Sequence, residues 1–294
     1  MTVFTDGALV AMHEMKGAFV NRVAFFDEKM REEYQRRNDI ERYMQEALTE
    51  GEFYVEYQPK INIETKRVIG AEALVRWNSK KLGPLRPDQF IPIFERNGFI
   101  GRIDMYVLRQ VCKLLKERTE KGLQIFPIAV NQSRMVFYDE DYINRLLAVL
   151  AEFSIPTHYI VLEITESMAM EDVEHMHSII DSLQKIGFRV SMDDFGSGYS
   201  SLNVLQKIAI NELKLDKGFL DNEEDSALSR SILEKIVQIA KEFSIETVAE
   251  GVETVAQLSF LKEIHCDVAQ GYFFARPMPV TAFEEYVEKQ NNQL

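Results

Sequence analysis

Short apolar runs that read as β-strands alternate with segments of helical periodicity, and this alternation restricts the fold more than any other feature of the chain. The strand-like runs are EFYVEYQP (52–59), VIGAEALVRW (68–77), FPIAVNQS (126–133), YIVLEITE (159–166), FRVSMDD (188–194), NELKLD (211–216), ETVAEG (246–251) and VAQGYFF (268–274). Apolar residues near a 3.6-residue period predict helices at 102–118, 141–153, 175–187 and 229–243. Alternating strands and helices favour a mainly parallel sheet.

The number of strands favours one architecture of this class. Eight strands with helices between them, over residues 51–294, match the size of a (β/α)8 TIM-type barrel, which is typically about 250 residues long. A doubly wound open sheet is the alternative, but no GxGxxG motif follows the first strand. We therefore predict an α/β barrel, with a helix that stops at Gly187.

Residues 1–50 do not follow the alternation. The segment FDEKMREEYQRRNDIERYMQEALTE (26–50) is highly charged and helical in pattern. Asn38 and Glu41 have the spacing of a capping box. We predict that residues 1–50 are a solvated connector or signalling helix preceding a domain at 51–294.

Composition excludes several classes of protein. The formal net charge of −13 leaves no basic stripe for a phosphate backbone, which argues against a duplex nucleic-acid partner. Cys112 and Cys266 lie too far apart for metal-ligand spacing and are expected to be reduced thiols. The segment has no signal peptide and no membrane-spanning run of about 18 apolar residues. We expect it to be cytoplasmic and not inserted in a membrane, although a longer parent protein can be membrane-anchored.

Polar residues recur near the ends of seven of the eight strands. They are Glu72, Asn131, Glu163, Asp193 with Asp194, Lys214 with Asp216, Glu250 and Gln270. Taken singly, each of them could equally be a residue of the barrel rim or a helix cap. In a parallel barrel, however, the carboxyl ends of the strands open on one face, where active sites lie. The set therefore predicts a site at that face.

The charge of this set points to metal ions. Six carboxylates stand against Lys214 and Arg76, and crowded carboxylates do not all stay ionised without cations. Oxygen ligands without His or Cys favour a hard metal such as Mg²⁺ or Mn²⁺. In SMDDFGSGYSSL (191–202) the adjacent Asp193 and Asp194 can hold two metals side by side, which suits phosphate-ester cleavage.

Several motifs, in this order along the chain, resemble one known family. They are EALVRW (72–77), AVNQS (129–133), LEITES (162–167), DDFGSGYSSL (193–202), LKLDKGF (213–219), VAEGVET (248–254) and DVAQGYFFARPMP (267–279). Together they resemble the signature of EAL-domain cyclic di-GMP phosphodiesterases, from about Glu52 to the C-terminus. The resemblance implies a (β/α)8-type barrel whose first strand is antiparallel. It also implies hydrolysis of cyclic di-GMP to linear pGpG with Mg²⁺ or Mn²⁺.

The resemblance also implies a role for each matching residue. Ligands of a first metal would be Glu72, Asn131, Glu163 and Asp193, with Asp193 shared with a second metal and Asp194 completing the coordination. Lys214 and Glu250 resemble the groups that orient and activate the attacking water, with an electrostatic role for Lys214. Substrate-contacting positions would be Gln58, Arg76, Asp216 and Gln270, where the planar fork of Arg76 suits a phosphate. Glu166 matches the residue that steadies the loop after the aspartate pair.

Departures from the family pattern are small and remove no ligand. Ser197 stands where threonine is commoner, Gln132 where leucine is common, and Lys217-Gly218 where Arg-Ser is commoner. An active phosphodiesterase is therefore favoured over the alternative, a cyclic di-GMP receptor that binds without useful turnover.

The N-terminal stretch TDGALVAMHEMKGAFVNRVAFFD (5–27) resembles the tail of a diguanylate cyclase (GGDEF) domain followed by its linker helix. This resemblance implies a fragment of a larger regulatory protein. The family also implies a homodimer.

Overall fold

In a computed structural model that describes residues 27–196, 205, 207–221 and 226–292, the chain forms two compact units. The first contains the described residues up to Tyr54 together with Arg76–Phe99, and the second contains Val55–Val75 and the described residues from Ile100 onward. Two long strands, β1 and β2, contribute residues to both units. The division predicted at residue 50 stays a prediction.

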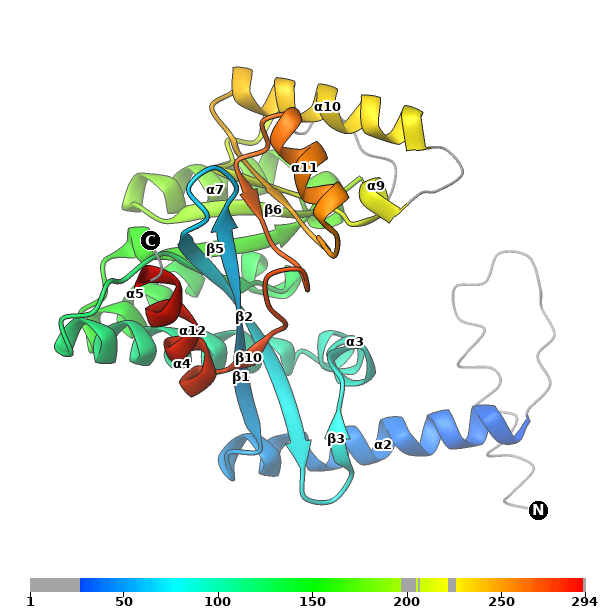
Figure 1. The fold of residues 1–294 in the computed structure, drawn as a ribbon. Helices are drawn as coiled ribbons and strands as arrows, with labels where there is room; N and C mark the ends of the chain where they lie inside the picture. The colour runs from blue at the N-terminus through cyan, green and yellow to red at the C-terminus, as the bar shows by residue number, and fades with distance from the viewer. Residues whose placement is uncertain (1–26, 197–204, 206, 222–225, 293–294) are drawn as a thin grey trace, which may run out of the picture. The chain divides into compact units, whose positions relative to one another are not determined.

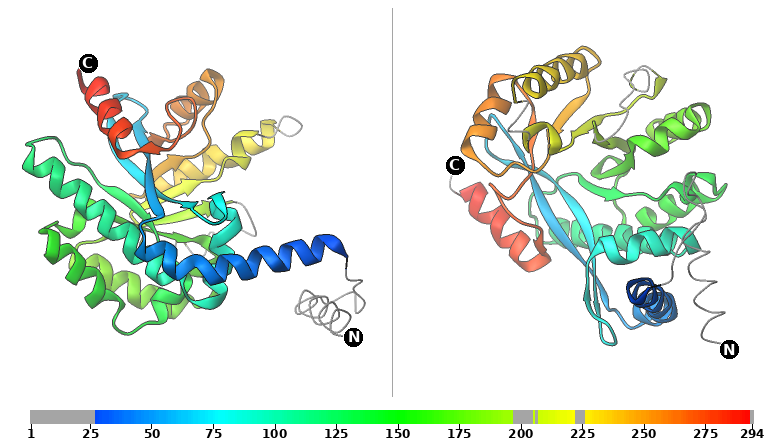
Figure 2. Two further views of the ribbon diagram at one scale, coloured as in Figure 1. Left: turned by 90° about the horizontal axis from the view of Figure 1, so that it is seen from below. Right: turned by 90° about the vertical axis from the view of Figure 1, so that its right-hand side faces the viewer.

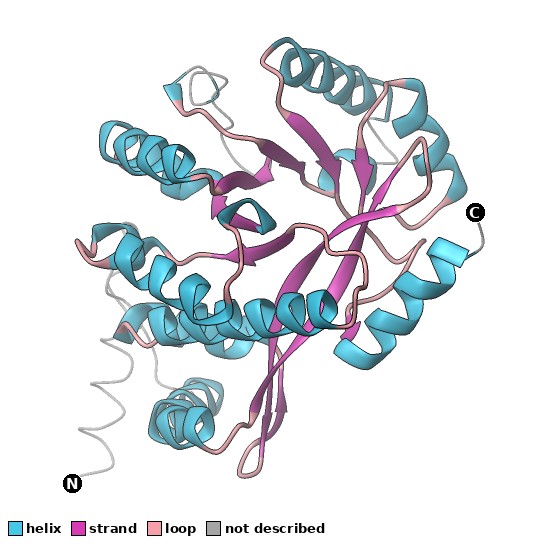
Figure 3. Ribbon diagram, turned by 90° about the vertical axis from the view of Figure 1, so that its left-hand side faces the viewer, coloured by secondary structure: helices cyan, strands magenta, loops and turns pink. Residues whose placement is uncertain are grey.

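Eight strands close into a barrel in the second unit. They are β1 (Phe53–Asn62), β2 (Val68–Ser79), β4 (Ile128–Asn131), β5 (Ile160–Thr165), β6 (Arg189–Phe195), β7 (Glu212–Leu215), β8 (Glu246–Ala249) and β9 (Val268–Ala269). Their order is β1-β9-β8-β7-β6-β5-β4-β2, and pairing of β1 with β2 closes the ring. Figure 3 shows these strands with helices packed around them. The predicted TIM-type barrel is confirmed.

One strand of the barrel runs against the others. β1 is antiparallel to β9, with Ile61 opposite Ala269, and also to the short β10 (Met278–Pro279). From β2 through β4 to β9, neighbouring strands are parallel. Residues 63–67 connect β1 to β2, and the Asn62 amide donates to the Arg67 carbonyl oxygen at 3.0 Å. A parallel pair needs a crossover of a dozen or more residues, so this short turn requires an antiparallel hairpin.

Helices follow most strands of the barrel and lie on its outside (Figure 2). The longer ones are α4 (Ile100–Glu120), α5 (Tyr142–Phe153), α7 (Val173–Ile186), α10 (Ser226–Glu242), α11 (Val255–Glu263) and α12 (Val280–Asn292). The four predicted helices correspond to α4, α5, α7 and α10. Gly187 ends α7 in the left-handed conformation with φ of 104°, as predicted. No helix in the described part of the chain is long and apolar enough to cross a membrane.

Shorter elements lie between the strands and the longer helices. They are η1 (Arg134–Tyr138), η2 (Thr157–Tyr159), α6 (Glu166–Glu171) and α9 (Gly218–Asp221). α6 begins directly after β5, and two residues separate α9 (Figure 1) from the end of β7.

The first unit contains α2 (Glu28–Thr49), β3 (Gly83–Leu85) and α3 (Pro87–Asn97) beside the outer parts of β1 and β2. Its core is aromatic: Phe53 stacks on Trp77 with ring centroids 4.9 Å apart, and Phe90 meets Trp77 edge-on at 5.7 Å. Trp77 also donates its indole N–H to Glu52 at 3.0 Å. These contacts give α3 and the strand ends a core of their own.

The N-terminal helix is longer than its capping signals indicated. α2 begins after Asp27, whose side chain accepts a hydrogen bond from the Met30 amide. The expected capping box at Asn38 and Glu41 is wrong, because both residues lie inside the continuous helix and Asp27 provides the cap about three turns earlier. Ile40 is fully buried, so the helix is not solvated on every side. The stretch that resembles a GGDEF tail, apart from Asp27, lies outside the described residues.

Candidate active site

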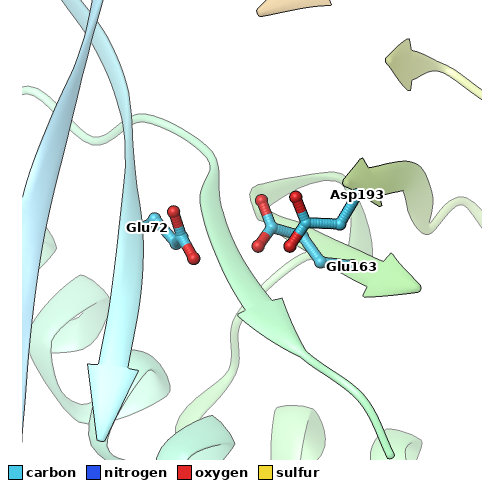
Figure 4. Close-up of side chains that lie close together, drawn as sticks. All are labelled: Glu72, Glu163 and Asp193. Atoms are coloured by element: carbon cyan, nitrogen blue, oxygen red, sulfur yellow. The ribbon is translucent and has the colours of Figure 1, made fainter. Parts of the chain in front are cut away.

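Three carboxylates from neighbouring parts of the ring meet inside the barrel. Glu72 on β2, Glu163 on β5 and Asp193 on β6 each offer an oxygen, and these oxygens lie within 4.8 Å of one another. Figure 4 shows the three side chains approaching one another from their separate strands. Glu72 and Glu163 are 5% and 1% exposed. We call these three residues the carboxylate cluster; water does little to screen its charges.

A second group of carboxylates shares Asp193 with the cluster. Oxygens of Asp193, Asp194 and Glu250 also lie within 4.8 Å of one another. Successive residues of a regular strand face opposite sides. The pairing of β6 with β7, however, shifts register between Met192 and Phe195, and Asp194 has a φ of 56°. This irregularity lets both aspartates serve one site.

Lys214 on β7 lies among the carboxylates of both groups. Its Nζ is 2.8 Å from Glu250 and 3.0 Å from Asp193, and it is 3.2 Å from Glu163 and 3.3 Å from Glu72. Burial alone would lower the pKa of Lys214, but the surrounding carboxylates raise it well above its ordinary value. The lysine is therefore a fixed positive charge at the centre of the site.

The carboxylates respond unequally to this crowding. Burial raises the pKa of Glu163 well above its ordinary value, and the neighbouring charge of Glu72 raises it further. Burial also raises the pKa of Glu250 to about 7, against the opposing effect of Lys214. For Glu72, burial is outweighed by Lys214 and other partners, and its pKa falls to about 2. The site holds more acid groups than its lysines neutralise.

A second buried lysine, Lys60, was not among the residues predicted from the sequence. Lys60 on β1 is 4% exposed, and its Nζ is 2.6 Å from Glu212 and 3.1 Å from Glu163. Glu163 thus contacts Lys60 through one oxygen and Lys214 through the other. The sequence indicates which way Lys60 and Glu212 face, because alternate residues of a strand share a face. Lys60 lies two residues after Gln58 and Glu212 lies two residues before Lys214, so each faces the same side as a predicted site residue.

Three amide side chains join the cluster to β1, β4 and the residue after β9. Gln270 Nε2 donates to Glu72 at 2.6 Å and to Gln58 at 2.9 Å. Asn131 Nδ2 donates to Glu72 at 3.1 Å, and Gln58 Nε2 donates to the Ala275 carbonyl oxygen at 3.1 Å. These hydrogen bonds fix the orientation of the Glu72 carboxylate.

The other predicted residues lie around this centre or beyond it. Glu166 is the first residue of α6, because β5 ends at Thr165, and its carboxylate accepts from the Gly196 amide at 3.4 Å. Asp216 accepts from the Gly218 amide at 2.8 Å, within the turn after β7. Arg76 is half-buried in the part of β2 that belongs to the first unit. Its substrate contact stays a prediction.

The donor set fits hard divalent cations. Both carboxylate groups offer oxygen atoms only, together with the amide of Asn131, which is the ligand type preferred by Mg²⁺ and Mn²⁺. The four carboxylates around the Lys214 ammonium are already arranged about a positive charge. The shared Asp193 makes the two groups adjacent, which is the arrangement that a pair of metals requires.

Comparison with protein families identifies the domain to which this site belongs. Residues 41–277 match the family model described as the EAL domain. The match covers the barrel strands and all of the site residues discussed above.

Curated relatives match over nearly the whole of this chain. Cyclic di-GMP phosphodiesterase NbdA of Pseudomonas aeruginosa is 32% identical over 278 residues, which is 95% of this chain and 36% of NbdA. Oxygen sensor protein DosP of Escherichia coli is 36% identical over 255 residues, which is 87% of this chain and 32% of DosP. The chain therefore spans about a third of the length of these relatives.

Solved structures show the same fold. The PaMucR phosphodiesterase in complex with c-di-GMP superposes with a TM-score of 0.79 at 34% identity, covering 83% of this chain and 99% of that one. The FimX EAL domain of Pseudomonas aeruginosa bound to c-di-GMP gives a TM-score of 0.74 at 21% identity, a likeness of fold.

Proposed function

The chain belongs to the EAL domain family, and from this premise we propose that it hydrolyses cyclic di-GMP to linear pGpG in a metal-dependent reaction. The observation that carries the proposal is the pair of adjacent carboxylate groups joined at Asp193 around one buried lysine. The names of NbdA and of the PaMucR complex support cyclic di-GMP as the substrate.

We propose that the two carboxylate groups hold two divalent cations. Glu72, Asn131, Glu163 and Asp193 would hold the first, while Asp193 and Asp194 would hold the second. When bound, such cations polarise the phosphate and lower the pKa of water. The protein's own contribution is to hold the oxygen donors in place. The hydrogen bonds from Asn131 and Gln270 hold the carboxylate of Glu72.

Lys214 and Glu250 are the proposed catalytic pair. The raised pKa of Lys214 supports an electrostatic role, since the ammonium keeps its proton and can stabilise negative charge at the phosphate. Among the carboxylates that contact Lys214, Glu250 has the most exposed side chain, at 21%. It is therefore the one that water reaches most easily, and it is the proposed base that takes the proton of the attacking water.

Four residues are proposed to contact the substrate. Gln58 and Gln270 hydrogen-bond to each other beside Glu72. Asp216 lies in the turn after β7. Arg76 offers a planar pair of donors for a phosphate.

Removal of divalent metal is expected to abolish pGpG formation. We expect excess chelator to stop turnover, and Mg²⁺ or Mn²⁺ to restore it. Ca²⁺ should inhibit, because its longer bonds of about 2.3–2.6 Å and looser shell change the spacing of a two-metal site. The measurement is chromatographic separation of pGpG from cyclic di-GMP. Binding of cyclic di-GMP without pGpG under all three metals would instead support a receptor, and full turnover in chelator would contradict metal dependence.

Glu166 provides a separate test of the loop after the aspartate pair. Its hydrogen bond from the Gly196 amide reaches the residue two positions after Asp194. We expect Glu166→Gln to lose most turnover, on the order of 10- to 100-fold, because small misplacements of reacting groups are costly. The first cation should still bind in a metal titration.

The matched control is Glu174→Gln, an exposed glutamate on α7 that should behave as the unmodified protein. Turnover near the unmodified level in Glu166→Gln, or complete loss of metal binding, would show that Glu166 does not anchor this loop.

We further propose that the domain works as a homodimer in the cytoplasm, alongside regulatory domains of a longer protein. The greater length of the relatives supports the last point, since this chain covers 36% of NbdA and 32% of DosP.

A further inference from the structure

A four-residue turn after β7 lies between the two loops that carry the second carboxylate group. The turn runs from Asp216 to Phe219 and includes the first two residues of α9. One of the two loops follows Asp193 and Asp194, and the other contains Glu250. Lys217 and Phe219 have no predicted role beyond their place in the motif LKLDKGF.

The first contact joins the turn to the aspartate loop. A Cβ atom placed on Gly196 would lie 2.1 Å from Phe219 Cε2 and 2.2 Å from its Cζ. The aromatic ring therefore packs directly over the backbone of Gly196, where even a methyl group would collide. Gly196 also has a φ of 99°, so glycine is favoured there for a second reason. The Glu166 carboxylate accepts from the amide of the same residue.

The second contact joins the turn to the loop of Glu250. A Cβ atom placed on Gly251 would lie 2.5 Å from Lys217 Cβ, so the lysine side chain packs against this backbone from its first carbon onward. The Glu250 amide donates to the Leu215 carbonyl oxygen at 3.1 Å, one residue before the turn. Glu250 is thus connected to the turn by packing and by a hydrogen bond.

The turn itself is held by internal hydrogen bonds. Asp216 Oδ1 accepts from the Gly218 amide at 2.8 Å, and the Asp216 carbonyl oxygen accepts from the Phe219 amide at 3.1 Å. The Asp216 amide donates to the Phe195 carbonyl oxygen at 3.3 Å. Lys217 and Phe219, which contact opposite loops, are therefore kept at a fixed separation.

We propose that the turn from Asp216 to Phe219 is a spacer that sets the distance between the aspartate pair and Glu250, with Phe219 as its positioning residue. The inference rests on the proposed function, because it concerns the second of the two proposed cations. Phe219 belongs to neither carboxylate group, and in this proposal it acts through its contact with Gly196.

The test compares Phe219→Ala with the unmodified protein and with Phe243→Ala, which truncates an exposed ring just after α10. Calorimetric titration of the free proteins with Mn²⁺ is the first measurement. We expect two binding events in the unmodified protein and in Phe243→Ala. In Phe219→Ala we expect the weaker event to lose at least about tenfold in affinity while the stronger one changes less than twofold. At saturating Mn²⁺, kcat should fall by about 10- to 100-fold.

Phe219→Leu and a double variant separate positioning from folding. The leucine variant keeps apolar contact, and we expect it to recover part of the lost kcat. Gly196→Ala should lower kcat in the unmodified protein, because the new methyl group collides with the Phe219 ring. In the Phe219→Ala background the ring is absent, so the same substitution should lower kcat less. If the two substitutions act independently, their effects will simply add. Three results would overturn the proposed spacer role: a single Mn²⁺ binding event in the unmodified protein, unchanged binding events in Phe219→Ala, or an equal loss of affinity in both events. Failure of the unmodified protein to form pGpG would overturn the proposed function instead.

Discussion

Glu250→Ala is expected to lower kcat by about 10²–10⁴-fold, the usual contribution of a general base, while cyclic di-GMP binding stays measurable. The carboxylate of Glu250 contacts Lys214 at 2.8 Å and is more exposed than the other carboxylates around that lysine. Glu72→Ala should differ, because it removes a buried member of the carboxylate cluster and therefore weakens metal affinity as well as turnover. Steady-state kinetics and a Mn²⁺ titration on both variants distinguish the two roles.

The control for Glu250 is Glu253→Ala, an exposed glutamate three residues further along the same loop. It should keep kcat within about twofold, since surface substitutions away from a site have small effects. Equal metal affinity in the unmodified protein and in Glu72→Ala would contradict the ligand assignment. A normal kcat in Glu250→Ala would require another base.

The barrel was predictable because its strands are buried on both faces. In β5 every residue from Ile160 to Ile164 is buried, and all of them except Glu163 are apolar, as is typical of parallel strands covered by helices. The predicted ends of the strands were less accurate. The segment 268–274 was predicted to be a strand, but only Val268–Ala269 forms one. Gly271 lies so close to Val252 that a Cβ atom would come within 2.2 Å of its backbone, and this packing replaces regular pairing.

The antiparallel direction of β1 was expected from the family resemblance alone, because the apolar pattern of the sequence does not indicate a strand's direction. A run such as 52–59 is equally apolar in either orientation. The five-residue connection to β2 held the information, because it is too short for a crossover between parallel strands.

The candidate site was predictable where its residues follow strands, and not where they lie deeper in the barrel. Asp193, Lys214 and Glu250 stand near the ends of their strands, and the fold brings them together. Lys60 and Glu212 are separated by 152 residues; Lys60 directly follows the predicted strand 52–59, and Glu212 is the second residue of the predicted strand 211–216. A charged residue at such a position has no visible partner until the order of the strands is known, so their pairing needed the structure.

Lys60 and Glu212 are expected to make a large contribution to the stability of the fold. Lys60→Met is expected to lower the free energy of unfolding by about 3–5 kcal/mol, because it leaves the buried Glu212 without its cation and Glu163 with Lys214 alone. Glu212 is 4% exposed and Glu163 is 1% exposed, so water cannot take the place of the lysine. Burial alone would lower the pKa of Lys60, but Glu212 and Glu163 raise it above its ordinary value, and the lysine is charged in the folded protein. Urea unfolding in chelator measures the loss without a contribution from bound metal.

The double variant Lys60→Met with Glu212→Gln shows whether charge or shape is responsible. It keeps side chains of similar length and removes one charge of each sign, and replacing a buried ion pair by neutral groups is often close to neutral for stability. We therefore expect it to recover most of the stability lost in Lys60→Met. The remaining deficit measures the contact between Lys60 and Glu163, which at 3.1 Å is the longer of the two ion pairs. If the double variant is as unstable as the single one, the loss in Lys60→Met does not come from the unpaired charge of Glu212, and this explanation is wrong.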